Sequence, residues 1–123
     1  MSRVSVSPSS YVTALGVQFY VEADGSATAI VLIDSRHEGP PGFAHGGALA
    51  SLLDEAMGAA VWYSGARVAA VHLSFDYKRA VPLGVQARVT GQVEQREGRK
   101  VFTTGAMRLP DDTVAVSARG IFV

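Results

Sequence analysis

The hydrophobic positions of the chain fall into several short alternating segments and one long segment that is apolar on nearly every side. Alternation is typical of half-buried strands, whereas a long apolar stretch without it is typical of a buried helix. The helix is predicted over residues 46–63, where Ser64-Gly65 ends it. Strands are predicted over residues 16–21, 27–33, 68–77, 85–95, 101–109 and 114–123.

The order of these elements predicts an α+β domain, with two strands before the helix and three or four after it. The Asp24-Gly25 pair predicts a hairpin between the first two strands. Because a helix that is apolar nearly all round must be covered on most sides, we expect a meandering, curved antiparallel sheet to wrap it. Residues 1–123 are expected to form this single domain, with polar residues 1–10 loose.

Helical spacing divides the predicted helix into a core face and a face of small residues around an acid. The core face is predicted to hold Leu49, Leu52, Leu53, Ala56, Ala60 and Tyr63. The opposite face, here called the small-residue stripe, holds Gly47, Ser51, Asp54 and Gly58. Glu55 lies about 100° further round, at the edge of the stripe. Two interpretations of Asp54 stay open: a structural acid at a dimer seam, or a functional acid that a ligand approaches.

A glycine-rich turn over residues 42–47 leads into this helix. The amides of Gly46 and Gly47 are among the first four of the helix, which have no acceptor within it, so they can stabilise an oxyanion. Asp54 lies two turns further along, and antiparallel helices in a symmetric dimer would bring it to those amides. We therefore expect a composite site at a dimer interface. His45 fits two roles: a turn residue that caps loop carbonyls, or a functional residue that acts as a substrate contact or general acid.

Composition and charge exclude several classes of partner and site. Eleven basic and eleven acidic residues give no net charge, which argues against a nucleic-acid partner. There is no cysteine, and His37, His45 and His72 lack zinc spacing, so no metal is expected. His37 and Glu38 are assigned to hydrogen bonding within their loop, and His72 to packing. With no signal-like segment and no membrane span, the expected location is the cytoplasm.

The most specific motif is His45-Gly46-Gly47 followed by Asp54, nine residues after the histidine. It resembles the motif of the PaaI-like acyl-CoA thioesterases, which have the hotdog fold. The runs over residues 38–47 and 77–83 look closer still to superfamily members that act on long-chain acyl-CoA. The resemblance covers residues 38–123. It implies one long helix wrapped by a curved antiparallel sheet, in a homodimer or a homotetramer built as a dimer of dimers.

The resemblance also implies a reaction, the hydrolysis of an acyl-CoA thioester to the free acid and coenzyme A. Coenzyme A enters as part of the substrate, and no cofactor is implied. Asp54 corresponds to the nucleophile or general base, and the Gly46 amide to the group that polarises the thioester carbonyl. Substrate binding is expected at His45, Gly47, Ser51, Glu55, Lys78 and Arg79, with Arg99 and Lys100 as further basic contacts to coenzyme A.

Two positions depart from the family pattern. Many relatives carry an asparagine six residues before the histidine, where this chain has Gly39. Many also carry a hydroxyl residue at the start of the strand after the helix, where this chain has Ala69 and Ala70. Two alternatives therefore stay open: a non-catalytic acyl-CoA-binding hotdog protein, and a hotdog hydratase or dehydratase acting on an acyl thioester.

Overall fold

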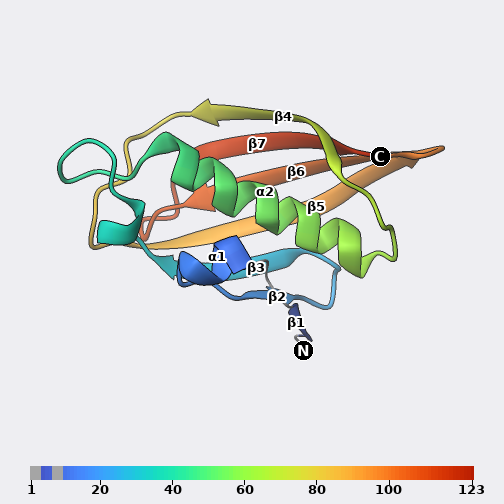
Figure 1. Ribbon diagram of the computed structural model, residues 1–123, viewed down its shortest axis with the longest axis horizontal. Coiled ribbons are helices and arrows are strands. Elements are labelled where there is room, and N and C mark those ends of the chain that lie inside the picture. The colour runs from blue at the N-terminus through green and yellow to red at the C-terminus, as the bar shows by residue number, and fades with distance from the viewer. Residues whose placement is uncertain (1–3, 7–9) are drawn as a thin grey trace.

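The computed structural model describes residues 4–6 and 10–123, and in this part of the chain one long helix lies across a curved antiparallel sheet (Figure 1). The long helix is α2 (Gly46–Tyr63), and the short helical elements are α1 (Ser10–Ala14) and the 3-10 turn η1 (Ser35–His37). The strands are β1 (Val4–Val6), β2 (Phe19–Val21), β3 (Ala27–Leu32), β4 (Ala70–Tyr77), β5 (Gln86–Glu97), β6 (Lys100–Arg108) and β7 (Val114–Phe122). This arrangement confirms the predicted fold class.

Residues 1–10 were expected to be loose, and part of that segment belongs to the sheet. Val4–Val6 form β1, which pairs antiparallel with β2 and places Val4 opposite Val21. Ser10 begins α1. The rest of the expectation, over residues 1–3 and 7–9, lies outside the described residues.

The sheet has the strand order β1-β2-β3-β5-β6-β7-β4, so it is not the simple meander that the sequence predicts. After β3 the chain crosses the sheet as α2, and β4 then pairs with β7 at the opposite edge. The order differs from a meander because α2 separates β3 from β4: an 18-residue helix spans about 27 Å and carries the chain to the opposite edge of the sheet. One edge of the sheet is therefore the eight-residue strand β4.

The core lies between α2 and the concave face of the sheet. α2 packs mainly on β5 and β6. Its buried residues are Leu49, Leu52, Leu53, Ala56, Met57, Ala60 and Val61. The predicted core face is therefore correct except at Tyr63, which is 50% exposed. Tyr63 is the last residue of the helix and lines an open surface pocket with the Asp24-Gly25 turn, so its side chain stays partly in solvent.

The depth at which α2 sits on the sheet depends on a cross-strand pair of glycines, Gly91 and Gly105. A Cβ at Gly91 would lie 2.5 Å from the backbone nitrogen of Met57 and 2.6 Å from the carbonyl oxygen of Ala56. A Cβ at Gly105 would lie 3.3 Å from the Leu53 and Met57 side chains. The backbone nearest to Gly105 is the Thr90 carbonyl oxygen of the neighbouring strand, at 3.2 Å, so of this pair Gly91 is the residue that meets helix backbone. Gly91 therefore sets the position of the helix.

Replacing Gly91 tests that conclusion. Gly91→Ala should lower the free energy of unfolding by about 2–3 kcal/mol, because helix backbone cannot move aside as a side chain can. Gly105→Ala is the matched control in the neighbouring strand and should cost less than half as much. Urea unfolding of both variants measures the difference. Equal costs, or a larger cost at Gly105, would show that the helix is not seated on Gly91.

Candidate functional site

A buried histidine anchors the loop that leads into α2. The His37 ring is fully buried, and its Nδ1 accepts a hydrogen bond from the Asp34 amide at 3.0 Å. Nε2 therefore carries the proton in the neutral ring and donates to the Leu15 carbonyl at 3.1 Å. The His37 carbonyl accepts from the His45 amide at 2.6 Å. His37 thus has the loop role predicted for it, and it fixes the residue before the helix.

The loop over residues 38–44 closes as a tight turn. The Phe43 amide donates to the Pro40 carbonyl at 2.9 Å, and Gly42 has φ +84°, which favours glycine. A carboxylate oxygen of Glu38 accepts from the Gly42 amide at 2.9 Å, which confirms its predicted loop role. This turn brings the end of the loop back beside Gly39, near the beginning of the loop.

Gly39 packs against His45 so closely that the side chain common in relatives has no room. A Cβ at Gly39 would lie 2.8 Å from the His45 Cα. Because Cβ atoms essentially never come that close to backbone, an asparagine here would require the loop to move. The departure at Gly39 is therefore part of how this loop packs.

The first turn of α2 has one unsatisfied amide. His45 is the N-cap residue, and its Nδ1 accepts from the Gly47 amide at 2.8 Å. The His45 carbonyl accepts from the amides of Ala48 and Leu49 at 3.0 and 3.2 Å. Among the described residues, no acceptor bonds to the Gly46 amide. The expectation of two free amides is therefore right for Gly46 and wrong for Gly47, because the His45 ring caps the helix.

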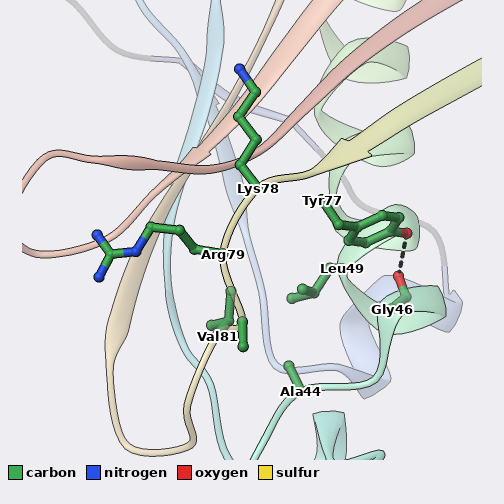
Figure 2. A pocket seen from close by; sticks show the side chains of 8 residues that line it. Ala44, Gly46, Leu49, Tyr77, Lys78, Arg79 and Val81 are labelled. Carbon is green, nitrogen blue, oxygen red and sulfur yellow. Dashed lines mark hydrogen bonds between the residues drawn. The ribbon is translucent and has the colours of Figure 1, made fainter.

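Tyr77, at the end of β4, contacts the same helix start from the other side. Its hydroxyl donates to the Gly46 carbonyl at 2.8 Å (Figure 2). A Cβ at Gly46 would lie 3.6 Å from the Tyr77 ring, which is ordinary contact. Tyr77 begins the motif run over residues 77–83, but no role is predicted for it from the sequence. Its position directly before the basic pair Lys78-Arg79, at a strand end, was the available signal.

An open pocket of about 300 Å³ lies over the start of α2 (Figure 2). It is lined by Ala44, Gly46, Leu49, Tyr77, Lys78, Arg79, Ala80 and Val81. The floor is mostly apolar, and Lys78 and Arg79 extend away from the Gly46–Tyr77 pair. The fold thus brings together three predicted site residues, Gly46, Lys78 and Arg79.

The two basic residues of this pocket differ in their partners. The Arg79 guanidinium bonds to Thr113 Oγ1 at 2.5 Å and to an Asp111 carboxylate oxygen at 3.3 Å. Within the described residues, the Lys78 ammonium has no hydrogen-bond or ion-pair partner. Lys78 is therefore available to an anionic ligand, whereas Arg79 is held in place by the β6–β7 turn.

Arg99 and Lys100 do not join this pocket. Lys100 begins β6, and the other end of that strand is Arg108, which pairs with Val114. The next residue of β7, Ala115, accepts the amides of Lys78 and Arg79. A nine-residue strand, about 30 Å long, therefore separates the two basic groups in one chain (Figure 1).

Asp54 is half-buried on the outer side of α2. Burial raises the pKa of its carboxyl, and the charge of neighbouring Glu55 raises it further. Within the described residues, Asp54 has no hydrogen bond or ion pair. It lies eight residues after Gly46, which is about 12 Å along the helix axis. One chain therefore does not bring Asp54 and the Gly46 amide to a single carbonyl group.

Two other predicted residues lie away from the pocket. Ser51 donates through Oγ to the Gly47 carbonyl at 2.9 Å, so its hydroxyl is bonded back to the helix. His72 is exposed on β4 rather than packed as expected.

Over residues 4–6 and 10–123, no three His, Asp or Glu side chains gather closely enough to hold a metal ion. In the same ranges, no helix is long and apolar enough to span a bilayer.

Comparison with known proteins now decides the family. The model of the thioesterase superfamily matches residues 41–116, which include the whole of α2 and the pocket. The chain belongs to the thioesterase superfamily. The resemblance seen in the sequence is thereby confirmed.

Relatives of this superfamily chain include the acyl-coenzyme A thioesterase THEM4 of Xenopus laevis, 37% identical over 85% of this chain and 48% of that protein. The chain spans about half the length of the curated relatives it matches. A solved thioesterase superfamily protein is 37% identical over 87% of this chain and 53% of that one, with a TM-score of 0.83. The Escherichia coli PaaI protein, at 22% identity, covers 90% of this chain and 85% of its own with a TM-score of 0.83. The fold is therefore the predicted hotdog fold.

The raised pKa of Asp54 makes a prediction about stability. A carboxyl whose folded pKa lies above its unfolded pKa favours folding only while it is protonated, and this contribution is lost as pH rises through the folded value. Asp54→Asn removes the charge and keeps the shape. The variant should match the parent chain in urea unfolding near pH 4 and become the more stable one toward pH 7. A less stable variant at pH 7 would mean that the ionised carboxylate stabilises the fold.

Proposed function

We propose that this chain hydrolyses acyl-CoA thioesters to the free acid and coenzyme A. The observation that carries the proposal is the unsatisfied amide of Gly46, a residue that lines the same pocket as Lys78 and Arg79. A donor with no acceptor among the described residues is ready to bind a carbonyl oxygen. Curated relatives of this chain are named acyl-coenzyme A thioesterases.

In the proposed reaction, the Gly46 amide donates to the thioester carbonyl oxygen and stabilises the negative charge that develops there. The positive end of α2 adds to that stabilisation. A thioester already has a good leaving group, so one oxyanion donor and one carboxylate are sufficient chemistry. The remaining three amides of the first turn are occupied, which leaves Gly46 as the donor.

Asp54 is the proposed carboxylate, acting as a general base on water or as the nucleophile. Its raised pKa favours either role, because a more basic carboxylate accepts a proton more readily near neutral pH. An acid that is half-buried without a partner costs stability, and catalysis is a physical reason to keep one.

The 12 Å between Asp54 and Gly46 is bridged, in our proposal, by a dimer. β4 is an edge strand, and its Val71 side chain is 63% exposed. A strand edge of eight residues is a template for strand pairing. Two copies paired antiparallel through β4 would be related by a two-fold axis that also sets their α2 helices antiparallel. Asp54 of one protomer then approaches Gly46 of its partner.

Coenzyme A is proposed to lie across the rim of the pocket. Lys78 supplies a free ammonium for its phosphates, and Arg79 a guanidinium that Asp111 and Thr113 hold in position.

The packing of Gly39 against His45 favours one alternative, an acyl-CoA binder without catalysis, because it excludes the asparagine of many relatives. Release of free thiol from acyl-CoA separates the two functions.

Removing only the Gly46 N–H is the sharpest test of the oxyanion donor. Gly46→Pro deletes that proton at the first helical position, where proline is favoured, and His45 already has the extended backbone that precedes proline. We expect kcat for thiol release to fall about a hundredfold or more. Gly46→Ala keeps the amide and has room for its Cβ, so it should retain most activity. Similar rates for both variants would exclude this amide as the donor.

A second test compares the two adjacent acids. Asp54→Asn should lower kcat about a hundredfold or more, while Glu55→Gln should cost much less. Because hydrolysis needs ionised Asp54, kcat should rise with pH through its raised pKa. The negative charge of Glu55 contributes to that rise in pKa, so Glu55→Gln should move the acid limb of the pH profile to lower pH. An inactive Glu55→Gln with an active Asp54→Asn would reverse the assignment.

A further inference from the structure

Side chains from two different segments hold both ends of the peptide group between Gly46 and Gly47. On one side, His45 Nδ1 accepts the N–H of Gly47 at 2.8 Å. On the other side, the Tyr77 hydroxyl donates to the C=O of Gly46 at 2.8 Å. His45 belongs to the helix cap, whereas Tyr77 reaches it from the end of β4, 31 residues away in the chain (Figure 2).

This part of the helix needs external support. Two consecutive glycines have the widest backbone freedom of any pair, and the first turn of a helix is the place where it frays. Neither glycine has a side chain that packs to restrict it. Without Tyr77, the carbonyl of Gly46 would lose a contact that is independent of the helix itself.

The hydrogen bond of Tyr77 also bears on the free amide. The Gly46 N–H belongs to the preceding peptide group, whose carbonyl, that of His45, is held by the amides of Ala48 and Leu49. The following peptide group is held by His45 and Tyr77. Because the peptide planes on both sides of Gly46 are fixed, the two backbone dihedral angles of Gly46 are fixed. The direction of its N–H is then fixed as well.

We propose that Tyr77 is a positioning residue, whose hydroxyl orients the free amide of Gly46 from behind so that it points into the pocket. This inference rests on the proposed function, in which that amide binds the thioester oxygen. Tyr77 acts through the backbone of Gly46 and makes no bond to the reacting atoms. Preorganised donors are effective because their orientation costs nothing at the moment of reaction.

The surroundings of Tyr77 suit this task. Partial burial raises the pKa of its hydroxyl, so the proton that it donates stays in place across the pH range in which Asp54 titrates. A Cβ at Gly46 would lie 3.6 Å from the Tyr77 ring, so the ring stands beside the first residue of α2 while its hydroxyl donates to the Gly46 carbonyl.

The test is Tyr77→Phe, which removes the hydroxyl and keeps the ring against Gly46. Tyr63→Phe is the matched control, since Tyr63 ends the same helix and, in the described part of the chain, its hydroxyl has no partner. Steady-state kinetics with an acyl-CoA, thermal unfolding and ¹⁵N relaxation of the Gly46 amide are measured for both. In Tyr77→Phe we expect kcat to fall about tenfold at unchanged KM and unchanged midpoint of unfolding. The order parameter of the Gly46 N–H should fall from about 0.85 toward 0.6.

Each other result counts against the inference. An unchanged kcat or an unchanged order parameter overturns it, and so does a fall in kcat that Tyr63→Phe reproduces. A rise in KM alone would make Tyr77 a binding residue. A lower midpoint of unfolding would make it a structural one. If the parent chain releases no thiol from any acyl-CoA, the proposed function fails, and the relaxation experiment alone still decides whether Tyr77 orients the amide.

Discussion

The position of the first residue of α2 depends on hydrogen bonds that converge from three separate parts of the chain. The amide of His45 donates to the carbonyl of His37, the amide of Ala44 to the carbonyl of Val81, and the hydroxyl of Tyr77 to the carbonyl of Gly46. These contacts hold the glycine-rich entry to the helix, while Gly91 sets how deeply the rest of the helix sits on the sheet. The pocket over Gly46 exists because both constraints are met together.

Asp54 is in the opposite situation, because the fold gives its carboxyl few stabilising interactions. The carboxyl is partly desolvated next to a second acid, and within the described residues it has no compensating donor. In a protein selected only for stability, a neutral side chain would serve better at this position. The unsatisfied amide and the unsatisfied acid lie on the same helix, two turns apart, and a symmetric pair of chains offers the simplest way for them to meet.

The sequence predicted the parts of the molecule that depend on local pattern. The alternation of apolar residues located the long strands, and the run of apolar residues located α2 to the residue, because its start and end carry strong local signals at Gly46 and Ser64-Gly65. The features that it missed depend on contacts distant in the chain. Tyr63 is apolar enough for the core, but it ends the helix at an open surface pocket. The position of Tyr77 before a basic pair marks it for attention, but does not indicate that its hydroxyl reaches the carbonyl of Gly46. The capping of Gly47 by His45 is local, yet histidine is an uncommon N-cap, so ordinary capping rules did not predict it.

The central claim is that each site takes its amide from one protomer and its carboxylate from the other. Mixed dimers test it most directly, formed by co-expressing Gly46→Pro with Asp54→Asn under two affinity tags and purified through both. In the mixed dimer, one site combines both changes and the other combines neither. The account predicts that each inactive parent gains activity on mixing, to about half the activity of the unmodified dimer, because one of two sites is intact. Mixed dimers that assemble and stay as inactive as their parents would contradict it, because both groups would then act within one protomer.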